Sequence, residues 1–251
     1  MGTDIHSMVE VQEYSFSNNA WGKWRASKVQ AFEQPYYRED CPLSEWNSPR
    51  RSVPLADRNY TLFALLGDVR NGTGFAGVRT GDPITPIGAN RGVPDDASNG
   101  WRKYVSRWGA NLHSTTYYSL PELTAHPLYG QRLVRTGALE SAEYERVLRE
   151  GGKPREWCGS ALGRGVVTVT PDEYAAGQRG EQATYVQYVW EDKLSDSLAE
   201  LFSAIEVMKK FAPYDHPKLD ALPAEQRDAL SRSDRMPRDY SRVRLVLGFD
   251  N

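Results

Sequence analysis

The start of the chain alternates hydrophobic and polar residues in the way that a β-strand does. Residues 5–16 predict a strand with Val9 and Val11 on one face and Asp4, His6, Met8 and Glu10 on the other. A turn cluster at 17–20 follows, and alternation resumes over residues 24–32. This pattern predicts an N-terminal β-hairpin, which Trp21 and Trp24 would cover.

The last nine residues, 243–251, are strongly apolar and predict a buried final strand. If this strand pairs antiparallel with the N-terminal one, its end lies beside the start of the chain. Asp250 and Asn251 would then lie near Asp4 and His6.

Helical spacing of apolar residues appears between the two ends. The first predicted helix begins at Asp57 or Asn59 and stops at Asn71-Gly72. A second begins at Ser119, where Ser119 and Glu122 can form a capping box. Three more are predicted over residues 139–150, 183–211 and 224–231. Residues 113–120 read as a short strand. The glycine-rich stretch 71–111 is predicted to be an ordered functional loop, and residues 151–182 a polar surface excursion.

This arrangement predicts an α+β fold in one domain, 1–251, in which a small, mostly antiparallel sheet packs against helices. The sheet would consist of the N-terminal hairpin and the C-terminal strand. No internal repeat or low-complexity segment interrupts the chain.

Charge and cysteine content narrow the class of protein. A net charge of −2 and a pI near 6.1 argue against coating of duplex DNA, which requires many cationic phosphate contacts. Cys41 and Cys158 are far apart in sequence and are expected to be free thiols in a reducing cytoplasm. The sequence begins without a signal peptide and has no apolar run long enough for a membrane span, so we expect a cytoplasmic protein.

Several short motifs together resemble a family of uncharacterised phage and bacterial proteins, whose members open Met-Gly-Cys-Asp-Ile-His and end Phe-Asp-Asn. The matching segments are residues 1–6, 58–71, 91–98, 113–114 and 249–251. Thr3 stands where the family has a cysteine, and residues 130–182 have no counterpart. The resemblance implies a phage or prophage origin and a bacterial host cytoplasm, but it implies no activity.

The N-terminal Asp4 and His6 are the strongest candidates in the chain for a functional site. They would project from one strand face, where a carboxylate and an imidazole can share a metal, form an acid–base pair, or simply anchor the strand. With His113, and with Asp250 or Asp96 as a fourth group, they would make a mixed nitrogen and oxygen site that suits Zn²⁺, Mn²⁺, Ni²⁺ or Fe²⁺. The leading hypothesis takes Asp250 as the fourth ligand. His126 and His216 each precede a proline and are expected at the surface.

Two further groups of residues could bind a phosphate. Arg91 could clamp an anion while Asp96 acts as a general base; the alternative is ordinary turn chemistry around Pro94 and Ser98. The second group, Arg58, Asn59 and Tyr60, lies at a predicted helix N-terminus, which favours anions, although simple capping would also explain it. Ser114, beside His113, completes the candidate ligand contacts.

Aromatic residues flank the loop, and they could stack on bases or form a small core beneath it. These residues are Trp101, Tyr104, Trp108, Tyr117 and Tyr118. Phosphate-binding and nucleophile motifs of the common enzyme classes are absent.

The leading hypothesis is a phage-encoded metal-assisted hydrolase of a nucleotide or another small phosphate-containing molecule, with His113 and Asp96 at its catalytic centre. The alternatives are a non-catalytic protein that sequesters a host nucleotide signal or blocks a host defence protein, and a purely structural role. The sequence leaves open whether the protein is an enzyme.

Overall fold

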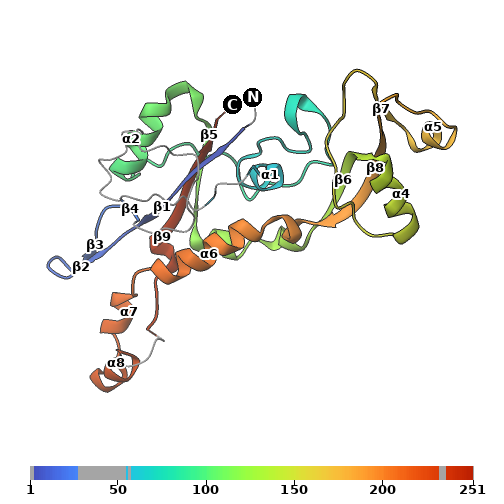
Figure 1. Cartoon of the computed structure of the whole chain (residues 1–251). Helices are drawn as coiled ribbons and strands as arrows, with labels where there is room; N and C mark the ends of the chain where they lie inside the picture. The colour runs from blue at the N-terminus through green and yellow to red at the C-terminus, as the bar shows by residue number, and fades with distance from the viewer. Residues whose placement is uncertain (1–2, 28–54, 56–57, 232–235, 251) are drawn as a thin grey trace. The chain divides into compact units, whose positions relative to one another are not determined.

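The computed structural model describes residues 3–27, 55, 58–231 and 236–250, and it has the predicted α+β architecture (Figure 1). The chain divides into two compact units. Of the described residues, 59–86 and 127–198 form what we call the middle-sheet unit, and the others form the terminal-strand unit.

The terminal-strand unit is built on an antiparallel sheet in the order β4-β1-β9-β5. Its strands are β1 (Ile5–Val11), β4 (Arg25–Ala26), β5 (His113–Ser119) and β9 (Val243–Phe249). All seven residues of β9 are buried, because β9 lies between β1 and β5. The register runs from Ile5 opposite Phe249 to Val11 opposite Val243, which confirms the predicted pairing of the two ends.

The predicted hairpin is present but is interrupted. After β1, the short strands β2 (Tyr14–Ser15) and β3 (Ala20–Trp21) pair around a turn in which Asn19 has a positive φ of 50°. The chain then returns to β1 through β4. Residues 28–32 of the predicted second strand lie outside the described residues, as do Cys41, Asp57 and Asn251.

The sequence-based prediction missed two helices of this unit, and the longer one lies in the stretch 71–111. α2 (Asn99–Trp108) occupies part of the stretch expected to be a loop, and the Ser98 side chain caps it by accepting from the backbone N–H of Trp101. Gly100 within the first turn hid this helix from sequence patterns, because glycine disfavours helix interiors. Here, a Cβ on residue 100 would lie 3.2 Å from the Cβ of Ala26.

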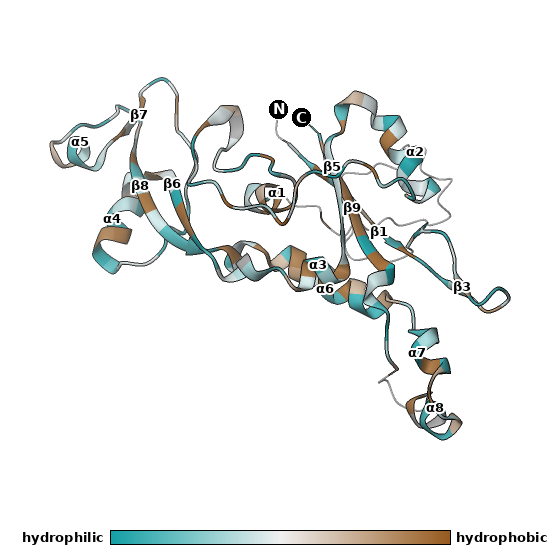
Figure 2. Cartoon of the chain, turned by 180° about the vertical axis from the view of Figure 1, so that it is seen from behind, coloured by the Kyte–Doolittle hydropathy of each residue, from teal (hydrophilic) through white to brown (hydrophobic). Residues whose placement is uncertain are grey.

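The side chains of α2 form a core with one face of the sheet. Met8, Trp101, Tyr104, Leu112 and Val246 are buried together in this cluster. In Figure 2, α2 accordingly alternates between hydrophilic and hydrophobic residues along its length. The flanking aromatic residues therefore belong mainly to a core, as one of the two interpretations expected.

The remaining helices of the terminal-strand unit are short apart from α6. They are α3 (Leu120–Thr124), α6 (Ala199–Phe211), α7 (His216–Asp220) and α8 (Ala224–Ser231), with 3₁₀ turns at Gly109–Asn111 and Tyr240–Arg242. The Ser119–Glu122 capping box of α3 and the α8 boundaries are as predicted.

The middle-sheet unit contains a second sheet, in the order β6-β8-β7. Its strands are β6 (Arg132–Glu140), β7 (Val166–Val169) and β8 (Ala183–Lys193), and its helices are α1 (Tyr60–Gly67), α4 (Ser141–Glu150) and α5 (Pro171–Ala175). 3₁₀ turns occupy Phe75–Gly77, Pro127–Gly130 and Leu194–Ser197. β8 pairs antiparallel with β6 and parallel with β7.

This unit contains the largest error of the sequence-based prediction. Residues 183–211 do not form one helix, because their first half is strand β8 and only the second half is helix α6. Thr184, Val186 and Trp190 alternate inward along β8, and all three are buried. Aromatic and β-branched residues fit a pleated strand, but their spacing also matches a helical stripe. The excursion at 151–182 likewise contains β7 and α5.

No helix among the described residues is both long and apolar enough to cross a membrane.

Asn59 explains where α1 begins, since its side chain accepts a hydrogen bond from the Leu62 N–H and its amide donates to the carbonyl of Ser197. We expect Asn59→Ala to lower the free energy of unfolding by about 1 kcal/mol, as for other N-caps. Asn59→Asp, which keeps the capping acceptor, should retain most of it. Urea unfolding measures both variants, and an unchanged alanine variant would contradict the capping role.

Candidate functional site

The pairing of β1 with β9 brings His6 and Asp250 together, as the sequence predicts. His6 Nε2 lies 3.3 Å from Asp250 Oδ2, and His6 Nδ1 lies 2.6 Å from the Tyr104 hydroxyl of α2. Asp250 Oδ1 also accepts from the backbone N–H of Asp4 at 2.8 Å. The Trp108 ring packs 4.3 Å from the His6 ring, which closes the cluster.

Burial determines the charge of His6. Desolvation lowers the pKa of His6 below its usual value, although Asp250 and Asp4 act in the opposite direction. A neutral imidazole that donates from Nε2 to Asp250 can accept from the Tyr104 hydroxyl at Nδ1. Only 7% of His6 is exposed, so a ligand has little access to these hydrogen-bonding groups. Their contacts hold the start of β1 beside the end of β9.

The Asp4 carboxylate turns toward Arg58 rather than toward His6. Arg58 Nη2 donates to Asp4 Oδ2 at 2.9 Å, and its Nε donates to the other carboxylate oxygen. The hydrogen bond from Arg58 is the main reason that the pKa of Asp4 is lowered. Arg58, predicted to bind a phosphate, therefore has a carboxylate partner within the fold.

His113 does not join the predicted metal site. It pairs with Phe249 across β5 and β9, and Phe249 also pairs with Ile5 on β1. Directly paired residues share a sheet face and successive residues alternate, so His113 lies on the face opposite to His6. Among the described residues, no three His, Cys, Asp or Glu side chains are grouped so that they could hold a metal ion. The predicted four-residue site of Asp4, His6, His113 and Asp250 is thus not assembled, because His113 lies on the other face of the sheet.

Arg91 is also engaged within the fold. Its Nη2 donates to Glu122 of α3 at 2.6 Å, and its Nη1 donates to the Tyr117 carbonyl at 3.2 Å. The hydrogen bond to the Glu122 carboxylate raises the pKa of Arg91. Arg91, predicted to clamp a phosphate, therefore links the loop around residue 91 to β5 and α3. Ser114 lies in a β-bulge of β5 with a positive φ of 49°, and its Oγ is 3.1 Å from His113 Nδ1.

The other predicted ligand contacts, Asn59 and Tyr60, belong to the middle-sheet unit. Asn59 caps α1, and the Tyr60 ring packs against Phe63 at 5.6 Å and beneath Arg70 at 5.9 Å. The capping alternative is thus the one that the contacts favour.

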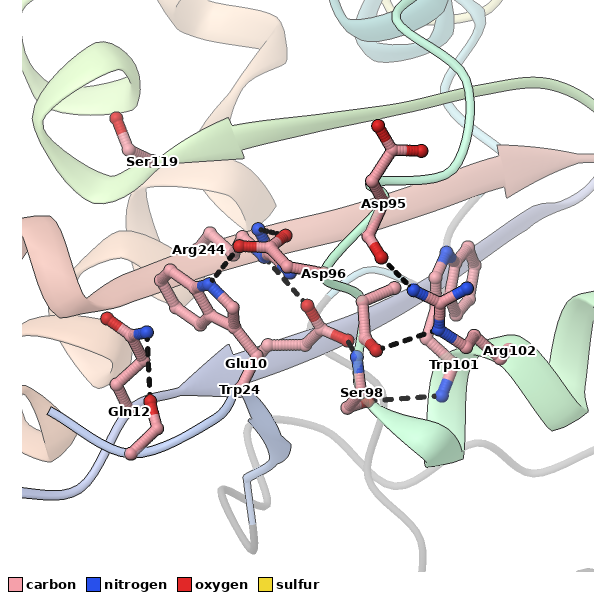
Figure 3. A network of polar contacts seen from close by, with 12 residues as sticks. Glu10, Gln12, Trp24, Asp95, Asp96, Ser98, Trp101, Arg102, Ser119 and Arg244 are labelled. Carbon is pink, nitrogen blue, oxygen red and sulfur yellow. Dashed lines mark hydrogen bonds and ion pairs between the residues drawn. The ribbon is translucent and has the colours of Figure 1, made fainter.

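A polar network of the terminal-strand unit centres on Arg244, which the sequence patterns did not single out (Figure 3). Arg244 Nε donates to Glu10 Oε2 at 2.7 Å, and its Nη1 donates to Asp96 Oδ1 at 2.7 Å. Glu10 Oε1 accepts from the backbone N–H of Ser98 at 2.8 Å, just before α2. Glu10 is fully buried and the Arg244 side chain is 6% exposed. This buried ion pair therefore holds Ser98, the residue that precedes α2, in place.

Sequence reasoning could have found this pair from the register alone. Glu10 lies directly opposite Arg244 once Ile5 is paired with Phe249. An acidic residue on the inward face of a strand requires a partner, and Arg244 at that register position supplies one.

Asp96 links this buried network to the surface. Trp24 Nε1 donates to Asp96 Oδ2 at 2.9 Å, and the Arg244 guanidinium packs 4.0 Å from the centre of the Trp24 ring. Burial would raise the pKa of Asp96, but the hydrogen bonds and charge of Arg244, with the bond from Trp24, outweigh it and lower the pKa. Asp96 is therefore held as a hydrogen-bond acceptor for Arg244 and Trp24, and its lowered pKa makes it a weaker base than an ordinary aspartate.

An open pocket of about 900 Å³ lies beside this network, entirely within the terminal-strand unit. It is lined by three groups of residues: the aromatic Trp21 and Trp24, the cationic Lys23, Arg25 and Arg102, and the polar Gln12, Asp95, Asp96, Ser98 and Asn99. Arg102 is held by the carbonyls of Ala97 and Asp95. The first turn of α2 contributes the N–H groups of Asn99 and Gly100, which precede any carbonyl of the helix that could accept from them.

Comparison with known proteins finds no matching family model, no curated relative and no solved structure of significant similarity.

Replacing Arg244 alone should destabilise the protein strongly, because Glu10 would remain buried without its cationic partner. We expect Arg244→Met to lower the free energy of unfolding by about 3–5 kcal/mol. The double variant Glu10→Leu/Arg244→Met should recover a large part of that loss. Urea unfolding of the wild type and variants measures this, and a single variant as stable as the wild type would contradict it.

The lowered pKa of His6 predicts that the free energy of unfolding decreases as the pH falls. The unfolded chain binds a proton at His6 more readily than the folded chain does. Stability contributed by neutral His6 is therefore present above about pH 6.5 and is lost as the pH falls toward the folded pKa. His6→Gln should make the unfolding free energy less dependent on pH between about 7 and 5.

His126, whose pKa is also lowered by burial, contributes equally in the wild type and in His6→Gln, so the difference between these two proteins isolates His6. Equal slopes in wild type and His6→Gln would show that His6 titrates as it does in the unfolded chain.

Proposed function

We propose that the terminal-strand unit binds a nucleotide, without turnover, in the pocket between the hairpin and the start of α2. The observation that carries this proposal is the composition of the pocket, which combines two tryptophans, three cations and fixed carboxylate and amide groups. A nucleotide has a planar base, polar base edges and an anionic phosphate, and it requires all three kinds of contact.

The tryptophans supply the surface for a base. Trp24 is held in place by its hydrogen bond to Asp96 and by the Arg244 guanidinium packed on its ring. Trp21 is held by Tyr14, at 5.2 Å between ring centres, and by Arg242. Because both rings are fixed before a ligand arrives, binding orders few side chains.

The cations and the α2 N-terminus supply contacts for phosphate. Lys23 is exposed at the pocket, while Arg25 also pairs with Glu13. The first-turn N–H groups of α2 add donors and a favourable dipole. Asp95 and Asp96 offset part of this positive charge, and their carboxylates suit the amino groups of a base edge.

The contacts favour this binding role over the metal-assisted hydrolase that the sequence suggested. The predicted metal ligands face opposite sides of the sheet or pair with groups of the fold, and Asp96 is tied to Arg244 and Trp24. Sequestration of a nucleotide signal in the cytoplasm of a bacterial host requires only the pocket.

Calorimetric titration with the four ribonucleoside monophosphates tests the proposal. We expect saturable binding of at least one, with the nucleotide recovered unchanged by chromatography. Lys23→Glu should weaken binding about ten-fold, because it replaces a charged phosphate contact by repulsion. Lys103→Glu changes the charge equally on α2 but outside the pocket lining, and it should bind like the wild type.

Two outcomes would count against the proposal. Absence of binding by all four nucleotides at millimolar concentration would exclude the pocket as their site. Conversion of the nucleotide during the titration would restore the hydrolase hypothesis.

A further inference from the structure

A row of aromatic rings, exposed at Phe16 and Tyr214 and partly exposed elsewhere, continues from the pocket along the hairpin. We call it the aromatic ridge, and it consists of Tyr14, Phe16, Trp21, Tyr214 and His216. Its members come from β2, β3, the turn after β2 and the start of α7, all within the terminal-strand unit. His216, expected to be a simple surface residue, is part of this ridge.

The rings of the ridge touch in sequence. Tyr14 lies 5.2 Å from Trp21, 5.4 Å from Phe16 and 5.0 Å from His216, with which it stacks at 25°. Phe16 meets the edge of His216 at 4.7 Å, and Tyr214 lies 6.4 Å from His216. These contacts hold the rings in place, so the ridge is a preformed surface.

Phe16 is not needed to fill a core. It is 73% exposed at the tip of the hairpin, where a polar turn residue would serve the fold equally well. Trp21 at the other end of the ridge also lines the pocket. A ligand longer than one nucleotide could therefore pass from the pocket onto the ridge without leaving aromatic surface.

Arginines accompany the ridge. The Arg242 guanidinium lies 4.9 Å from the centre of the Trp21 ring, and that of Arg238 lies 4.8 Å from the centre of Tyr214. Arg242 also pairs with Asp239, so the charge near Trp21 is partly compensated. Stacked aromatic rings interleaved with guanidinium groups match the alternation of bases and phosphates in a single strand. A duplex, whose base faces are stacked inside, offers nothing for these rings to bind.

We propose that the physiological ligand is a single-stranded nucleic acid, with one nucleotide in the pocket and the neighbouring bases on the aromatic ridge. This inference rests on the proposed function of the pocket and extends it from a mononucleotide to an oligonucleotide.

Fluorescence anisotropy of the full chain with labelled ten-nucleotide dT and rU strands tests the inference, beside calorimetry with the monophosphates. The strands should bind at least about ten-fold tighter than the matching mononucleotide, and a labelled duplex should bind more weakly than either strand. Phe16→Ala should weaken strand binding about five-fold or more while leaving mononucleotide affinity unchanged.

Two variants serve as controls. Phe16→Tyr keeps a ring and should restore strand binding. Leu162→Ala removes an apolar side chain that is 90% exposed in the other unit, and it should have no effect. Thermal unfolding of each variant verifies that the fold persists, as expected for exposed positions.

The outcomes separate the two proposals. If mononucleotides bind but strands bind no tighter, or if Phe16→Ala matches the wild type, the ridge is not a binding surface and the pocket proposal stands. Equal affinity for duplex and single strand would also overturn the ridge. If neither mononucleotides nor strands bind, the proposed function itself fails.

Discussion

The register between β1 and β9 is the constraint on which the rest of the terminal-strand unit depends. It places Glu10 opposite Arg244, and at the other end of the same pair of strands it brings His6 to Asp250. A slip by one residue would turn Glu10 away from α2 and expose the fully buried face of β9. The buried ion pair thus specifies the pairing, in addition to the hydrophobic contacts that stabilise it. Desolvation offsets much of the attraction within such a pair, so its main contribution is to exclude other registers.

The two polar clusters at opposite ends of these strands differ in access. His6 and Tyr104 are each only 7% exposed, and the Trp108 ring packs against the imidazole. The Arg244 network instead extends outward from fully buried Glu10 to the 65% exposed Asp96 side chain at the pocket. A ligand can reach the second cluster without any movement of the core. This difference, and not the number of ionisable groups, is why we propose the Arg244 end as the binding site, while the His6 end anchors the strands.

Sequence patterns predicted those features that depend on neighbouring residues or on alternation. The strand pairing of the chain ends, the capping box at Ser119 and the approach of Asp250 to His6 all follow from such patterns. The prediction failed where a pattern fits two structures, as in β8, or where tertiary contact overrides propensity, as at Gly100 of α2. The side of the sheet on which His113 lies depends on a β-bulge and on pairing with β9, and neither is visible in one sequence.

The same reasoning explains why the site we propose lies apart from the one that the sequence predicts. Asp96 was identified from the sequence, but its role depends on Trp24 and Arg244, which are 72 and 148 residues away along the chain. Once Arg244 holds Asp96 as an anion and packs against Trp24, the carboxylate and the ring become fixed walls of the pocket. A group held in that way is poorly suited to exchange a proton but well suited to recognise a donor. The interaction that secures the fold therefore also determines the chemistry that its pocket offers.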